Sequence, residues 1–284
     1  MKKLAFVIAL GWAGLAAAAG STTSVVNSPH DLSPTGLNVQ ITSAANAQSQ
    51  VCVFCHFPHN ANNAGAPLWN RRNATNAFTM YSQKNSSTFQ LANGDTNDTT
   101  RAVGPVSAAC LSCHDGQTAF NSLNQSPMID LDPGKSSQGS NYTFTLVGGG
   151  AVTSMGDVQA TNTEGSANLG TDLTNDHPIS FAYNAALVTL KGSTLRDPTT
   201  TPPITGGADD LVIYRAGAVA AGGPNTIAGQ MLFTKPGAGV PDQLECASCH
   251  EPHRHGDETN AHDNFPFLIK SNYASELCLT CHAK

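Results

Sequence analysis

Apolar and polar residues follow no sustained helical period over most of the chain. The best helix candidates are short, at residues 110–114 and 275–282, where apolar residues recur over one or two turns. The apolar runs at 142–147 and 211–214 are bounded by glycine and predict short strands. With 26 glycines, 16 prolines and only 12% charged residues, the sequence predicts mostly coil with short helices and a few short β-strands, and no large regular core.

The longest apolar run lies at the N-terminus. Lys2 and Lys3 precede an apolar stretch at 4–15, and small residues at 17–19 follow it, which is typical of a secretory signal peptide. The stretch is shorter than the roughly 20 residues that a membrane span needs. We therefore expect residues 1–20 to be removed as a signal peptide, leaving an exported chain with no membrane span.

The charge balance bears on possible partners. Removing Lys2 and Lys3 from the 14 basic residues leaves 12, against 20 acidic residues, so the formal net charge becomes −8. An acidic chain lacks the phosphate-neutralising surface of nucleic-acid-binding proteins. We therefore expect no nucleic-acid partner.

The eight cysteines occur only as pairs separated by two residues, and a histidine follows each pair directly. The cysteines are Cys52, Cys55, Cys110, Cys113, Cys246, Cys249, Cys278 and Cys281, and the histidines are His56, His114, His250 and His282. In a C-x-x-C-H segment two thiols form thioethers to the vinyl groups of one haem, and the adjacent imidazole reaches its iron. The sequence therefore predicts four covalently bound c-type haems.

Zinc sites and disulfides are the competing interpretations. Zinc binds four ligands in a tetrahedron, which gives no reason for a histidine immediately after each second cysteine. A disulfide across two residues gives no reason for a histidine either. Haem attachment accounts for both residue types at all four segments.

Each iron also needs a ligand on its opposite face, and ten histidines leave six beyond the four segments. His59 and His253 each follow a motif histidine by three residues, with an intervening proline that restricts the backbone. Each can therefore point away from its own haem towards an adjacent one. We predict distal ligation by His30, His59, His177 and His253. His255 and His262 are expected to face solvent, with His255 as an alternative to His253.

The haems change what such a loop-rich composition implies. The chain alone has little apolar surface to bury, but each haem adds an apolar macrocycle and two tethers that shorten loops. We expect residues 21–284 to form one haem-cored tetrahaem domain, and the apoprotein to be largely unfolded. The central segment 116–245 has no motif and would form wrapping loops or a small β subdomain.

Five stretches together resemble a known family. They are Ser28–Ser33 (SPHDLS), Cys52–Asn60 (CVFCHFPHN), Ala66–Arg71 (APLWNR), Cys110–Gly116 (CLSCHDG) and Asp176–Phe181 (DHPISF). In this order they resemble the OmcE-type four-haem cytochromes, which polymerise into extracellular electron-conducting filaments. The resemblance covers residues 28–183 and, more generically, the paired motifs in 246–282.

This resemblance implies a loop-dominated fold with four bis-histidine haems stacked in alternating parallel and T-shaped pairs. In such filaments a neighbouring subunit supplies one distal histidine. His30, His59, His177 and His253 match the distal positions. His30 is the candidate for the intersubunit ligand, because an N-terminal arm could reach a neighbour.

Three functions follow from these features. The leading expectation is a homopolymeric, extracellular or surface electron carrier, not an enzyme, that links other exported cytochromes to acceptors such as mineral oxides. A monomeric periplasmic shuttle with the same haems is the alternative. A multihaem oxyanion reductase would need an open iron position, and no variant motif such as C-x-x-C-K is present.

Overall fold

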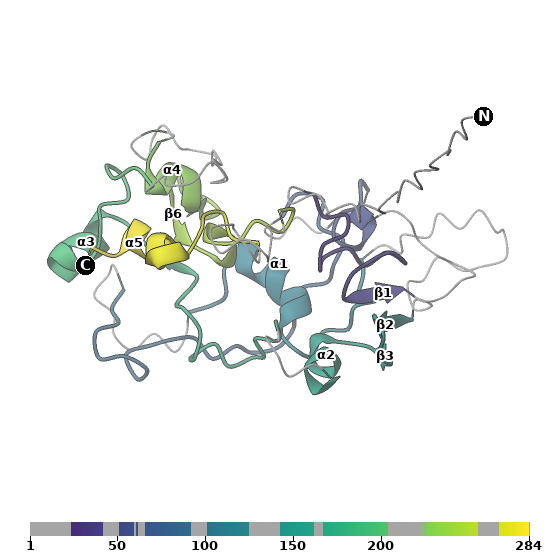
Figure 1. Cartoon of the computed structure of the whole chain (residues 1–284). Coiled ribbons are helices and arrows are strands. Elements are labelled where there is room, and N and C mark those ends of the chain that lie inside the picture. Colours follow the sequence, from purple (N-terminus) through teal and green to yellow (C-terminus); the bar gives the residue numbers. More distant parts are fainter. Residues whose placement is uncertain are drawn as a thin grey trace, which may run out of the picture.

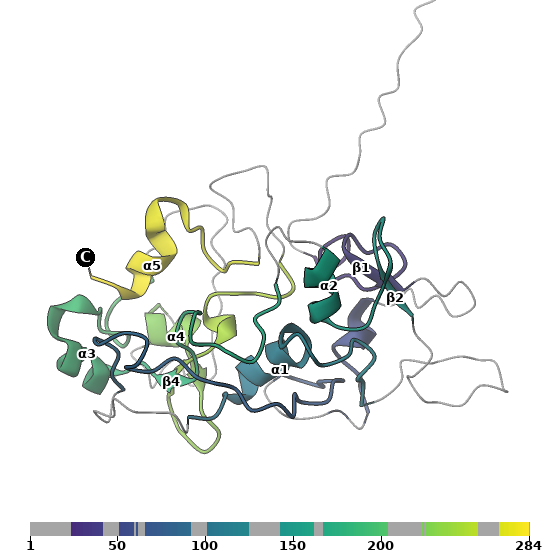
Figure 2. The same cartoon turned by 90° about the horizontal axis from the view of Figure 1, so that it is seen from below.

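A computed structural model describes residues 24–41, 51–59, 61, 66–91, 101–124, 143–161, 167–203, 223, 225–254 and 267–283. These parts form a body that is longer in one direction than in the other two (Figures 1 and 2). Coil predominates, with short helices and two small antiparallel sheets. The predicted fold class is confirmed in this respect.

One end of the body is built on the sheet β1-β2-β3, whose strands are Val39–Ile41, Phe144–Leu146 and Ala151–Val152. The strand predicted at 142–147 is therefore confirmed as β2. The sheet packs with helix α2 (Met155–Thr161) and the 3-10 helix η2 (Val51–Phe54). Phe54 is fully buried, and its ring meets that of Phe144 edge to face at 6.2 Å. The first C-x-x-C-H segment is thus fixed to this sheet.

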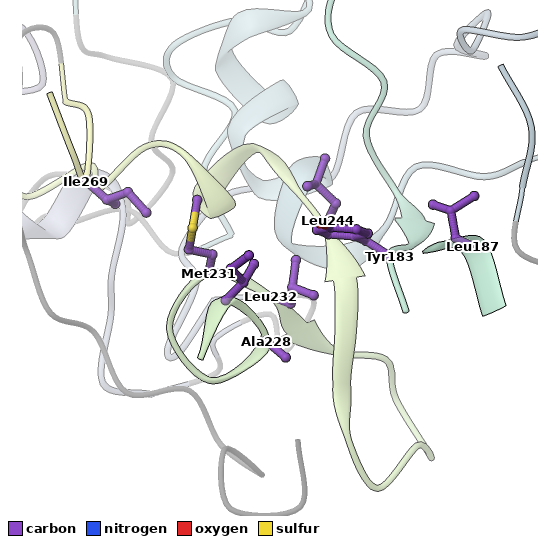
Figure 3. Close-up of a cluster of buried hydrophobic side chains, with 8 residues drawn as sticks. Tyr183, Leu187, Ala228, Met231, Leu232, Leu244 and Ile269 are labelled. Atoms are coloured by element: carbon purple, nitrogen blue, oxygen red, sulfur yellow. The ribbon is translucent and has the colours of Figure 1, made fainter. Parts of the chain in front are cut away.

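The other end is built on the sheet β4-β6-β5, formed by Phe181–Ala182, Pro241–Leu244 and Phe233–Thr234. Helices α3 (Ala185–Lys191) and α4 (Ile227–Met231) contribute to its core. Figure 3 shows this cluster, to which α4 contributes Ala228 and Met231 and strand β6 contributes Leu244. Leu277 and Cys281 of helix α5 (Glu276–Cys281) pack against the same cluster.

Helix α1 (Pro105–His114) lies between the two ends (Figures 1 and 2). It begins with proline, whose fixed φ suits the first helical turn. Leu111 on its buried face packs with Met80 and Leu173. Helices α1 and α5 confirm both helix candidates, around 110–114 and 275–282.

The coil is ordered by short polar side chains that hydrogen-bond to nearby backbone. Asp31 is fully buried, and its carboxylate accepts hydrogen bonds at 3.0 Å from the backbone N–H groups of Asn27 and Ser33. Asn, Asp, Ser and Thr stabilise turns in this way. The same composition that lowers helix content therefore holds irregular segments in place.

The described parts of the central segment 116–245 contribute strands to both sheets. The strand predicted at 211–214 and the predicted signal peptide at 1–20 lie outside the described residues. Among the residues that are described, no helix is long and apolar enough to cross a bilayer.

Candidate functional site

Each C-x-x-C-H segment lies on one or two helical turns, in η2, α1, the 3-10 helix η5 (Cys246–Ser248) and α5. In three of the segments the backbone N–H of the histidine donates to the carbonyl of the first cysteine, at 2.8 Å for His56, 3.1 Å for His250 and 3.0 Å for His282. Side chains three and four positions apart lie on one face of a helical turn. Both thiols and the imidazole can therefore meet one ligand.

None of the eight cysteines, all of which the structure describes, forms a disulfide. Burial raises the pKa of the Cys55 thiol to about 12, and of the Cys281 thiol to about 12. These thiols are therefore protonated near neutral pH. The disulfide framework considered for the sequence is absent from the fold.

Cysteines of successive segments lie near one another, in the order of the chain. Across the first junction Cys113 raises the pKa of Cys55, after the larger effect of burial. Across the second junction the interaction between the Cys110 and Cys246 thiols raises the pKa of Cys110 and lowers that of Cys246. At the third junction Cys249 raises the pKa of Cys281, after the larger effect of burial. The four segments therefore form an array in which successive segments are neighbours.

The first segment has a second histidine opposite its own. The rings of His56 and His253 are 6.0 Å apart between centroids and inclined by 25°. A histidine nitrogen binds a metal ion at about 2.0 Å and the ring centroid lies roughly 1.1 Å behind it, so two ligands on opposite faces of one ion have centroids roughly 6 Å apart. His56 and His253 thus have the separation of two axial ligands.

The second segment has an equivalent pair. His30 and His114 have ring centroids 6.0 Å apart, with an interplanar angle of 66°. On its other side, the His30 ring stacks on Phe267 at 4.2 Å. His30 is therefore held beside a motif histidine of its own chain, which argues against the expectation that His30 reaches a neighbouring subunit.

All four rings are oriented through Nδ1. It lies 2.6 Å from the Pro67 carbonyl in His56, 2.7 Å from that of Ala167 in His114 and 3.1 Å from that of Pro252 in His30. In His253 it lies 2.6 Å from the Glu251 carboxylate. These oxygens only accept hydrogen bonds, so Nδ1 carries the proton and the lone pair is on Nε2. This is the usual arrangement of metal-binding histidines.

The surroundings of the second pair favour neutral imidazole. Burial, together with the nearby His114, lowers the pKa of His30 to about 4. Burial also lowers the pKa of His114. In the first pair, the hydrogen bond to Glu251 raises the pKa of His253. Neutral histidine is the form that binds metals.

The other predicted distal ligands have different surroundings. His177 is exposed, and its Nδ1 lies 2.9 Å from the Pro178 carbonyl. His59 is exposed as well, and within the described parts neither ring contacts a motif histidine. His255 and His262 lie outside the described residues. The structure thus places two of the four predicted distal histidines, His30 and His253, beside motif histidines.

Asn70 and Arg71, both buried, connect the first two segments. The Asn70 side chain donates to the Val53 carbonyl at 2.7 Å, and its backbone N–H donates to Cys55. The Arg71 guanidinium donates to the Ser112 carbonyl at 2.8 Å, as well as to carbonyls at positions 119 and 120. Two consecutive residues therefore fix the first segment relative to the second. Nothing else in the sequence indicated this role, although both residues belong to the Ala66–Arg71 stretch that contributes to the family resemblance.

Glu245 connects the second and third segments. Its buried carboxylate accepts hydrogen bonds from the Ser107 hydroxyl on α1 and, at 3.0 Å, from the Ser180 hydroxyl. The Ser107 hydroxyl also accepts from the backbone N–H of Cys246 at 3.0 Å. Burial raises the pKa of the Glu245 carboxyl. This residue was not predicted either, since a single acid beside a motif has no distinctive pattern.

No protein-family model and no curated protein sequence matches the chain. Within the described ranges, no three His, Cys, Asp or Glu side chains gather around a single point where they could hold one metal ion. The site is therefore defined by the four segments and the two histidine pairs, and its interpretation depends on their geometry.

Replacing Arg71 with lysine should lower the free energy of unfolding by about 2–4 kcal/mol, because lysine keeps the buried charge but cannot reach the separate carbonyl acceptors. Arg72→Lys is the matched control, since Arg72 is exposed. Denaturant titration of both variants measures the difference. Equal stability of the two variants would contradict the role assigned to Arg71.

The free energy of unfolding of the Glu245→Gln variant should increase relative to that of wild type as pH rises above 4.5, the ordinary pKa of the carboxyl. The folded pKa is raised, so wild-type stability is complete below that pH and is lost as pH rises through the folded pKa. Glutamine stays neutral and can still accept from both serines.

Unfolding titrations across a pH series measure the difference between variant and wild type. Asp172→Asn serves as a control of opposite sign, because hydrogen bonds from Thr174 lower the pKa of Asp172. A pH-independent difference for Glu245→Gln would count against the raised pKa.

Proposed function

We propose that this chain is an exported tetrahaem c-type cytochrome that carries electrons over long distances outside the cell. The observation that carries the proposal is the pair of opposed histidines at 6.0 Å beside each of the first two C-x-x-C-H segments. A bound haem supplies a one-electron iron couple whose potential depends on its ligands and burial. The chain supplies attachment, axial ligands and spacing.

The roles of the residues follow from the geometry. The two cysteines of each segment would form the thioethers, and His56, His114, His250 and His282 would each bind one iron. His253 would complete the first site and His30 the second. His59 and His177 remain as distal ligands for the third and fourth sites, in this or a neighbouring subunit.

The histidine pairs favour electron transfer over catalysis. Two axial histidines leave no coordination position for a substrate. The linear order of the segments, from η2 through α1 and η5 to α5, suits a carrier that passes electrons from one end of the body to the other. An oxyanion reductase would instead need one open site, and neither pair provides it.

A haem-cored fold is consistent with the small size of the protein's own apolar clusters. The described residues form three such clusters, one at each end and one around Leu111. Each haem would add apolar surface that is worth about 25 cal/mol per Å² when buried. We therefore expect the four haems to supply much of the core and the apoprotein to remain largely unfolded.

The position of His59 supports a form of the proposal in which the protein assembles into a filament. The first segment lies at one end of the array and α5 at the other. His59 follows the first segment, is exposed, and is adjacent to a proline that directs it away from its own site. It could therefore ligate an iron of a neighbouring copy at the end of the array. A monomeric periplasmic shuttle is the alternative.

His253→Ala should leave four haems attached but convert one of them to a high-spin form, because His56 would then be the only axial ligand from the protein. Absorption spectra and intact mass of the exported protein measure both quantities. A variant that keeps four low-spin haems would contradict the assignment, and wild-type protein without haem would refute the proposed function itself.

His59→Ala should abolish filaments while leaving the haem count unchanged, since the intersubunit ligand would be lost. Electron microscopy of wild-type and variant protein tests this directly, with His177→Ala as the matched exposed histidine. Filaments in the His59 variant would refute its intersubunit role. If the wild-type sample held only single particles, the monomeric periplasmic shuttle would be the favoured function.

A further inference from the structure

Arg254 is a largely buried cation whose Nε has no hydrogen-bond partner among the described residues. Its residue surface is 9% exposed, and its Nε atom is buried with no hydrogen-bond acceptor. Burying a charged group costs several kcal/mol unless an opposite charge or hydrogen bonds compensate for it. Among the described residues, nothing therefore offsets the burial of the Arg254 Nε.

The other strongly buried cations in the described parts are satisfied. Arg71 donates to carbonyl oxygens around the end of α1. The Lys270 ammonium lies 3.5 Å from the Glu276 carboxylate. Arg254 differs from both, since no described side chain supplies an acceptor for its Nε.

The position of Arg254 ties it to the histidine pairs. It directly follows His253, whose ring opposes that of His56. Two residues earlier, the Pro252 carbonyl accepts from the ring of His30 in the second pair. A turn closed by the hydrogen bond from Arg254 N–H to the Glu251 carbonyl, at 3.0 Å, holds this segment together. Arg254 thus lies in the one short segment that serves both sites.

Glu251, three positions before Arg254, is already used. Its carboxylate accepts from Nδ1 of His253 at 2.6 Å and from the His253 backbone N–H at 3.2 Å. The described residues therefore supply no acceptor for the Nε of Arg254. The cofactor of the proposed function carries two propionate carboxylates, and a planar guanidinium binds a carboxylate through two parallel hydrogen bonds.

We propose that Arg254 binds a haem propionate at one of the two sites flanking the His253 segment. This inference rests on the proposed function and adds to it a residue that recognises the carboxylate of the cofactor. Arg254 would hold the propionate in its ionised form and place a fixed positive charge near the iron. The fixed positive charge favours the reduced haem.

Potentiometric titration of the haem-loaded protein over a pH series tests the proposal, using wild type, Arg254→Gln, Arg254→Lys and the exposed control Arg72→Gln. Arg254→Gln should shift one haem to lower potential and move the pH dependence of that haem to higher pH. Arg254→Lys keeps the positive charge but loses the two parallel hydrogen bonds of the guanidinium. It should therefore lower the potential of the same haem by less. Arg72→Gln should match wild type.

Intact mass of the same samples distinguishes a failure of the proposed function from a failure of the role assigned to Arg254. Samples without haem would refute the proposed function. Four haems per chain with Arg254→Gln potentials that superimpose on wild type would overturn only the role of Arg254. Should Arg254→Gln fail to fold, unchanged potentials in Arg254→Lys would overturn it equally.

Discussion

The separation of the two histidine pairs is the constraint on which the rest of the arrangement depends. His56 and His253, like His30 and His114, come from distant parts of the chain, and their ring centroids lie 6.0 Å apart. The hydrogen bond from His30 to Pro252 alone joins positions 222 residues apart. Closing loops of that length costs conformational entropy, and a metal held between each pair would offset that cost. This explains how a chain with so little regular structure can adopt one fold.

Buried polar groups then set the spacing between neighbouring segments. Asn70 and Arg71 fix the first junction through backbone carbonyls, and Glu245 fixes the second through Ser107 and Ser180. Such contacts are directional, whereas apolar packing is not. A carrier that must keep its sites at constant separation gains from this directionality. The proposed contact between Arg254 and a haem propionate would extend the same principle to the cofactor.

Local features of the fold could be predicted from the sequence. The recurrence of apolar residues around Cys110–His114 indicated one or two helical turns, and the run at 142–147, bounded by glycine, indicated a strand. Strand β6 could not be predicted, since Pro241–Leu244 has a polar centre and forms a strand only because β4 and β5 flank it. The distal histidines stay a prediction. Which motif histidine lies beside His30 or His253 depends on contacts between remote segments, so the sequence could not indicate the pairs that the structure shows.

The most direct test of the account is an electron cryo-microscopy map of the haem-loaded protein at a resolution that shows side chains. The account predicts iron between His56 and His253 at the first site and between His30 and His114 at the second, with four irons in chain order along the body. Irons ligated by other partners at both sites, or the eight cysteines engaged in zinc or disulfide bonds, would contradict it.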